Sequence, residues 1–109
     1  MFVFYTNFGI PKPHAACARG FLIFIRPEYK DDIGLLEHEK VHVKQFLCTL
    51  GLHSILYRLS ERYRLWAEVQ AYKVQLIHSP GNEALFATFI AERYGLDIST
   101  AAAAALLKE

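Results

Sequence analysis

Proline and glycine mark the places where regular structure must stop in this chain, and they divide it into two unequal parts. Pro11, Pro13 and Pro27 all fall in the first quarter, and proline cannot continue a helix or a central strand. From residue 33 onward the hydrophobic pattern is helical, and its clearest break is the turn Ser79-Pro80-Gly81. We therefore expect short strands followed by helices, in an α+β fold that is mainly helical.

Two strands are expected before Pro27. Residues 2–5 and 20–26 are rich in aromatic and β-branched side chains, which favour strands. Residues 6–19 read as a loop. We expect the N-terminal part to form a small antiparallel sheet or a single rim strand. Both faces of the 20–26 segment are apolar, so both are expected to be covered.

The rest of the chain predicts five helices. Asp31 and Asp32 suit the N-terminus of the first helix, and Gly51 suits its end. Asn82 can cap the fourth helix, and Ser99 or Thr100 can cap the last one. The predicted ranges are 33–50, 52–59, 61–77, 82–92 and 101–107.

Length and composition indicate one domain over residues 1–109, which is long enough to bury a single core. Apolar residues make up 53% of the chain, above the usual 45–50% or so, and a cleft or partner surface would account for the surplus. No apolar run, including residues 21–25 and 101–107, comes near the roughly 20 residues of a membrane-spanning helix. The start lacks the pattern of a secretory signal, so we expect a cytoplasmic protein without a membrane span.

Charge and cysteine usage exclude two further classes. The 12 Lys and Arg residues nearly balance the 11 Asp and Glu residues, and no dense basic cluster is present that would bind nucleic acid. Cys17 and Cys48 are far apart and have no CxxC spacing, which argues against a disulfide framework or a cysteine zinc site. They read as small hydrophobic side chains in a reducing compartment.

The predicted helix 33–50 contains the string His38-Glu39-Lys40-Val41-His42, an HExxH motif. Positions i and i+4 of a helix lie about 40° apart around its axis, so both imidazoles can reach one metal ion. Glu39 is about 100° from His38 and is expected beside the ion. A catalytic zinc ion needs a third protein ligand and keeps one position open for water.

Glu68 is the candidate third ligand. It interrupts the apolar pattern of the 61–77 helix, beside the small residues Ala67 and Ala71, which let two helices approach closely. An ionised carboxylate on a buried helix face is costly unless it is paired or bound to a metal. We therefore expect His38, His42 and Glu68 to hold a zinc ion together.

An HExxH helix followed by Glu68 in a Glu-x-x-Ala-Tyr setting on a later helix resembles the gluzincin metallopeptidases, most closely their small stand-alone members. The resemblance covers residues 20–77. It implies a zinc endopeptidase that acts on peptides or unfolded proteins, with Glu39 as general base. It also implies that the strand 20–26 is the upper rim, which binds an extended substrate through main-chain hydrogen bonds.

Other polar residues have two or more interpretations. Tyr72, one turn after Glu68, either donates a hydrogen bond to the oxyanion or packs in the core. Gln45, one turn after His42, supports a ligand, lines the cleft or lies on the surface. The remaining histidines lack ligand spacing and are interpreted as structural: His14, His53 and His78.

Two alternatives to an active peptidase stay open. In the first, zinc only ties two helices together in a non-catalytic interaction module, although such a site has no use for Glu39. In the second, the peptidase is latent because residues 99–109, a slim alanine-rich helix, lie in the cleft. The alternative position for this tail is a capping helix on the far side of the core. Nothing in the sequence indicates an oligomeric state.

Overall fold

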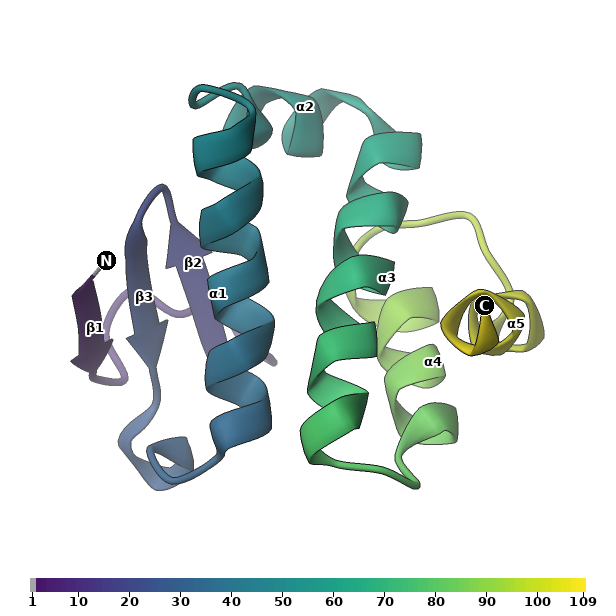
Figure 1. Cartoon of the computed structure of the whole chain (residues 1–109), viewed down its shortest axis with the longest axis horizontal. Helices are drawn as coiled ribbons and strands as arrows, with labels where there is room; N and C mark the ends of the chain where they lie inside the picture. Colours follow the sequence, from purple (N-terminus) through teal and green to yellow (C-terminus); the bar gives the residue numbers. More distant parts are fainter. Residues whose placement is uncertain (1) are drawn as a thin grey trace.

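The computed structural model describes residues 2–109 and has the expected α+β architecture, with a three-stranded sheet followed by helices (Figure 1). The strands are β1 (Phe2–Tyr5), β2 (Ala16–Arg19) and β3 (Leu22–Ile25). A 3₁₀ turn, η1 (Pro27–Tyr29), leads to the helices α1 (Ile33–Cys48), α2 (His53–Leu59), α3 (Glu61–His78), α4 (Glu83–Arg93) and α5 (Thr100–Lys108). No helix in the described part of the chain is long and apolar enough to cross a membrane.

The sheet is mixed, and its strand order is β1-β3-β2. β1 pairs with β3 in parallel, whereas β2 and β3 form an antiparallel hairpin. The strand predicted as the rim is therefore the central strand, and β2 is the edge strand on the side of α1. The rim prediction for residues 20–26 was wrong because the loop predicted before that segment contains a strand.

β2 was missed because Ala-Cys-Ala-Arg has little intrinsic strand preference. Pairing with β3 makes this segment extended, and a turn at Gly20, whose φ is 61°, joins the two strands. Left-handed φ suits glycine. A Cβ atom at this position would also lie 3.4 Å from the ring of Phe46. Gly20 therefore belongs to the turn, and β3 is shorter than the predicted strand.

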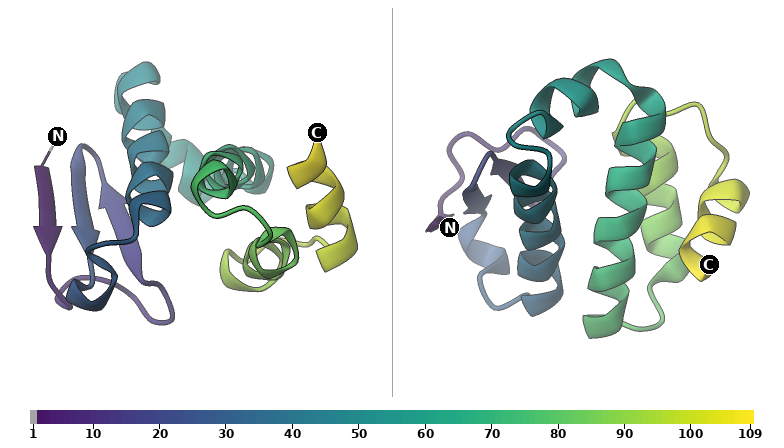
Figure 2. Two further views of the ribbon diagram at one scale, coloured as in Figure 1. Left: turned by 60° about the horizontal axis from the view of Figure 1, so that its bottom comes forward. Right: turned by 45° about the horizontal axis from the view of Figure 1, so that its top comes forward.

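One face of the sheet packs on α1 (Figure 2). Ile23 and Ile25 of β3 are fully buried and form a small core with Ala16 and Val43. On the other face Phe24 stacks on Phe4, which is itself exposed. The expectation that both faces of β3 are covered was therefore only half right.

The helix boundaries follow local signals closely. The Asp32 carboxylate accepts a hydrogen bond from the Leu35 amide at the start of α1, and Ser60 and Ser99 cap α3 and α5 in the same way. Asn82 occupies the N-cap position of α4, but its side chain makes no capping bond. The predicted end of the first helix was two residues late, since α1 ends at Cys48.

Helices α3, α4 and α5 form a second core on the side away from the sheet, with α5 outermost (Figures 1 and 2). Phe86 and Ile90 of α4 are buried there, with Ala103 and Leu107 of α5 beside them. α1 and α3 lie side by side between the two cores, and α2 joins them at one end. The α1–α3 seam is where the candidate site lies.

Candidate metal centre

His38, His42 and Glu68 converge in the seam between α1 and α3, and all three are buried. The i, i+4 spacing on α1 directs both imidazoles to the same side. The Nε2 atoms of His38 and His42 lie 3.3 and 3.2 Å from the same Glu68 oxygen, Oε1. One ligand atom from each residue lies within 4.8 Å of the other two, so the three predicted ligands are brought together.

Small side chains allow the two helices to approach this closely. Ala67 and Ala71 of α3 are fully buried, as the sequence pattern predicted. Gln45 of α1 reaches across the seam, and its amide donates a hydrogen bond to the backbone oxygen of Ala67. Nearer the start of α1, a Cβ atom at Gly34 would lie only 3.1 Å from the Ser79 hydroxyl. The close packing fixes Glu68 opposite the two histidines.

The donor set fits zinc. Two imidazole nitrogens and one carboxylate oxygen are the protein ligands of many catalytic zinc sites, which leave one position open. Ligand atoms at about 2.0 to 2.2 Å from a tetrahedral ion are about 3.4 Å from one another. The two nitrogen–oxygen distances, 3.3 and 3.2 Å, are close to this separation. These three residues could therefore hold zinc.

Gln45 orients one of the candidate ligands. Its Oε1 atom lies 2.9 Å from Nδ1 of His42 and, with its amide committed to Ala67, accepts the Nδ1 proton. In the neutral ring, which is the form that binds a metal, that proton position leaves the lone pair on Nε2, the nitrogen that faces Glu68. Gln45 thus supports a ligand, one of the three interpretations that the sequence allowed. Within residues 2–109, Nδ1 of His38 has no comparable partner.

Tyr57 of α2 holds the other end of the Glu68 carboxylate. Its hydroxyl donates a hydrogen bond of 2.5 Å to Oε2, so Oε1 remains directed at the histidines. Arg64 fixes this arrangement, because its guanidinium donates to the backbone oxygens of Tyr57 and Tyr94. Both carboxylate oxygens of Glu68 are therefore engaged by groups from other elements.

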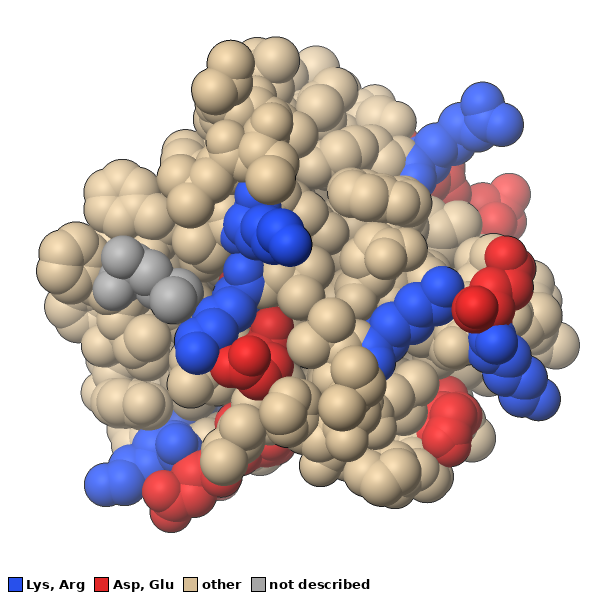
Figure 3. Space-filling view, in the orientation of Figure 1, with Lys and Arg blue, Asp and Glu red and all other residues tan. Residues whose placement is uncertain are grey.

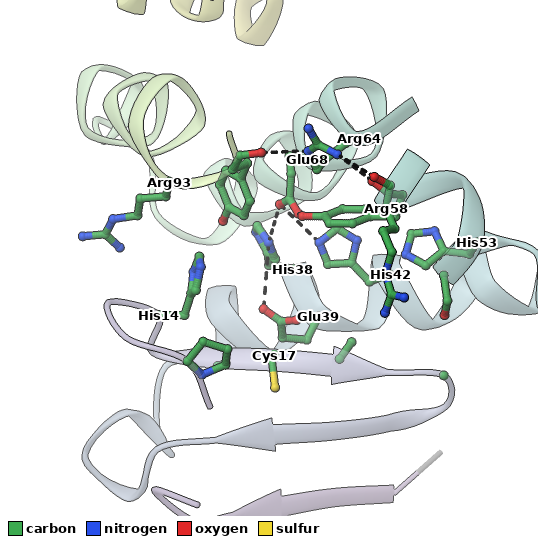
Figure 4. Close-up of a pocket in the computed structure, with 17 residues that line it drawn as sticks. His14, Cys17, His38, Glu39, His42, His53, Arg58, Arg64, Glu68 and Arg93 are labelled. Carbon is green, nitrogen blue, oxygen red and sulfur yellow. Dashed lines mark hydrogen bonds and ion pairs between the residues drawn. The ribbon is translucent and has the colours of Figure 1, made fainter. Parts of the chain in front are cut away.

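The site opens into a cavity of about 580 Å³, which is shown in Figure 4. His38, Glu39, His42 and Glu68 line its helical side, and β2 lines the opposite side. Glu39 Oε2 lies 3.9 Å from Nε2 of His38, and Figure 4 shows its carboxylate between the histidines and β2. Glu39 is thus beside the candidate ligands without being one of the three that converge.

Burial and charge perturb the titration of the site. Burial raises the pKa of Glu39. Burial lowers the pKa of His42, but the charge and hydrogen bond of Glu68, the Glu39 charge and the Gln45 hydrogen bond together outweigh burial and raise that pKa to about 9. Burial likewise opposes ionisation of Glu68, yet His42 and the hydrogen bonds of both histidines lower its pKa overall. Without a metal, His42 and Glu68 therefore form a buried ion pair at neutral pH.

Tyr57 and Tyr72, the two tyrosines near Glu68, have different surroundings. Tyr72, the predicted oxyanion donor, is buried with its hydroxyl 2.6 Å from that of Tyr94, and its ring packs edge-on against His38. It does not line the cavity, so the packing interpretation fits its position better. Tyr57 and Tyr94 do line the cavity. Burial, followed by the Glu68 charge, raises the pKa of Tyr57, which stays protonated.

Two histidines without ligand spacing also reach the cavity. His14 comes from the loop before β2, and His53 from the first turn of α2, where its Nδ1 lies 2.7 Å from the Tyr63 hydroxyl. Burial lowers the pKa of His53 to about 4, so its ring is neutral. Neither belongs to the converging ligand set. His78, at the end of α3, is remote from the cavity.

The C-terminal tail does not take the blocking position that the sequence left open as one alternative. No residue of 99–109 lines the cavity. α5 instead packs on α4 and α3 through Ala103 and Leu107. The apolar side chains at the end of α5 are buried in this second core. Residues 99–109 therefore do not occupy the α1–α3 seam. The hypothesis of a tail in the cleft was therefore wrong, and the capping position was right.

Sequence reasoning missed Tyr57 as the partner of Glu68. The available signal was weak: His53 and Tyr57 are four residues apart, so they share a face of α2. Nothing local indicates that this face meets a carboxylate eleven residues later. For Tyr94 and His14, nothing in the neighbouring sequence indicates a position at the cavity.

Comparisons with known proteins found no relative of this chain. No protein-family model matches the chain, and no curated protein or solved structure matches it. The interpretation of the site therefore depends on its own side chains and their geometry.

Proposed function

We propose that this protein is a zinc-dependent endopeptidase of the gluzincin type. The observation that carries the proposal is the convergence of His38, His42 and Glu68 with Glu39 beside them at a cavity wall. Two histidines and a glutamate would hold the ion. When bound in such a set, zinc supplies Lewis-acid activation of a water molecule and of a carbonyl group.

Glu39 has the position of a general base. Its carboxylate faces the cavity, so it can take a proton from water at Oε2. The same oxygen then carries that proton to the amine that leaves when the peptide bond breaks. A site that only ties α1 to α3 has no use for an acid at this position, which favours the peptidase over a non-catalytic zinc module.

β2 is suited to align the substrate, in place of the segment predicted from the sequence. It is an edge strand, paired with β3 on one side only, and Ala16, Cys17 and Ala18 line the cavity. An extended peptide can add to such an edge through main-chain hydrogen bonds. This mode of binding places few demands on side chains and suits peptides or unfolded proteins as substrates.

The experiment combines zinc analysis with hydrolysis of an unstructured protein. We expect about one zinc per chain, and cleavage that Glu39→Gln abolishes while zinc content stays unchanged. Glu37→Gln is the matched control, because Glu37 is also on α1 but pairs with Lys40 on the surface. Undiminished cleavage by Glu39→Gln would remove this residue from the mechanism. Stoichiometric zinc with no hydrolysis of any substrate would favour the interaction module.

A further inference from the structure

Arginine side chains are concentrated at the cavity. Arg58, Arg64 and Arg93 line it, whereas none of the chain's lysines does. The acidic residues that line it are Glu39 and Glu68 alone, which the proposed mechanism uses as base and ligand. On the face seen in Figure 3, by contrast, basic and acidic side chains are interspersed. The cavity therefore has more basic groups than its own carboxylates can neutralise.

Two of these arginines have guanidinium groups that remain free to bind a substrate. Arg64 is committed to the fold, because its guanidinium donates to the backbone oxygens of Tyr57 and Tyr94. Arg58 and Arg93 make no ion pair with any residue of the described part of the chain. A carboxylate that enters the cavity would therefore find basic partners that are not already neutralised.

Arg93 is held in place by an aromatic ring. Its guanidinium carbon lies 3.8 Å from the centroid of the Phe89 ring, one turn earlier on α4, in a cation–π contact. The side chain is partly buried, and its neighbour Glu92 does not line the cavity. A guanidinium that stacks on a ring keeps its N–H groups for a carboxylate, which it can bind through two parallel hydrogen bonds. Arg93 is thus a positioned cation without an acidic partner.

Arg93 and Arg58 lie at opposite ends of the cavity. Figure 4 shows Arg93 on the side of His14 and Arg58 on the side of His53, with the candidate metal ligands between them. Burial lowers the pKa of His14 and the Arg93 charge adds to this effect, which agrees with their proximity. An extended peptide on the edge of β2 would therefore pass the ligands and reach an arginine in either direction. Arg58 is exposed, so its ion pairs are expected to be weaker than those of Arg93.

We propose that the cavity selects peptides that carry a carboxylate near the cleaved bond, and that Arg93 binds this carboxylate. The inference rests on the proposed function for the position of the peptide along β2. The carboxylate belongs either to an aspartate or glutamate side chain or to the C-terminus of the peptide, and both sources offer the same chemistry. A basic residue at this position would be repelled by the unpaired arginines, and a bound zinc ion would add to the positive charge.

The first measurement is peptide binding to the metal-free wild-type protein, followed by fluorescence anisotropy. Without metal the peptide is not cleaved, and its carboxylate cannot bind zinc directly. The labelled peptides share one sequence: a capped peptide with a central glutamate, a capped peptide with glutamine there, and the glutamine peptide with a free C-terminus. We expect a peptide with a carboxylate to bind at least about tenfold more tightly than the capped glutamine peptide. Which one gains identifies the source of the carboxylate, and equal affinities of all would overturn the proposal.

Variants test the role of Arg93. Arg93→Gln should reduce the preference to less than about threefold, because an exposed cation such as Arg58 contributes little. Arg93→Lys, which keeps the charge but loses the paired donors, should retain part of it. Arg62→Gln is the matched control, since Arg62 is exposed on α3 and does not line the cavity. Circular dichroism of each variant must match the wild type. An equal preference in Arg93→Gln and Arg62→Gln would overturn the assignment of Arg93.

Cleavage by the zinc-loaded protein separates this inference from the proposed function. If both hold, kcat/KM for the favoured carboxylate peptide should exceed that for the capped glutamine peptide by at least about tenfold. Hydrolysis of all peptides at equal rates, together with equal binding, would leave the peptidase standing and overturn the carboxylate preference. Binding of a carboxylate peptide that depends on Arg93, without hydrolysis of any peptide, would support the preference and contradict the peptidase.

Discussion

Tyr57→Phe isolates one hydrogen bond at the candidate metal centre. The substitution removes a single oxygen, while the ring keeps its packing near His42, His53 and Arg64. The lost bond joins the Tyr57 hydroxyl to Oε2 of Glu68, at 2.5 Å, and Glu68 is only 2% exposed. Removing the hydroxyl leaves this buried carboxylate oxygen without its donor in the protein.

The magnitude follows from the charge of the acceptor. A hydrogen bond to a charged group contributes about 1.5 to 3 kcal/mol, which corresponds to roughly a 10- to 150-fold change in an equilibrium constant. Partners of metal ligands in other proteins typically contribute about 10- to 100-fold in metal affinity. We therefore expect Tyr57→Phe to weaken zinc binding about 10- to 100-fold, because Glu68 is no longer held toward the histidines.

The assay is a zinc titration in competition with a chromophoric chelator, with thermal unfolding of the metal-free proteins measured in parallel. Tyr29→Phe is the matched control, since Tyr29 lies in η1, is partly exposed and is outside the cavity. It should bind zinc like the wild type. Equal zinc affinity of Tyr57→Phe and wild type would refute the role assigned to this bond, and Glu68 would then be positioned by packing alone.

Three further predictions concern the ligands and the second core. His42→Ala should reduce zinc content from about one per chain to a small fraction, and zinc should no longer raise its melting temperature; unchanged zinc content by mass spectrometry would show that the ligand set is wrong. Because the pKa of His42 is raised to about 9 from 6.5, protonation stabilises the metal-free fold fully below about pH 6.5, and this contribution is lost as the pH rises through 9. Thermal scans should therefore show the metal-free protein losing stability over that range, whereas the zinc-loaded protein, in which the imidazole is already neutral, should not show this loss. Leu107→Ala, in the core between α4 and α5, should lower the free energy of unfolding, measured by denaturant titration, by about 2 to 4 kcal/mol. Its zinc stoichiometry should not change. An increase in hydrolysis would instead show that residues 99–109 limit access to the site.

The sequence by itself determined what depends on a single element. The spacing of His38 and His42 is a property of one helix, and the cost of burying Glu68 beside two alanines is visible in α3 alone. Capping signals at Asp32 and Ser99 likewise act within one turn. These features predicted the helices, the three converging residues and the mainly helical α+β class.

Only the tertiary structure decided which elements meet at the site. β2 has little strand preference of its own and is extended because β3 pairs with it, so the edge at the cavity is β2. Tyr57 reaches Glu68 because α2 closes the end of the α1–α3 seam. α5 packs on α4 and α3 because its buried side chains Ala103 and Leu107 join the second core. Contacts between distant segments depend on how whole elements pack, and the periodicity of a single segment does not contain that information.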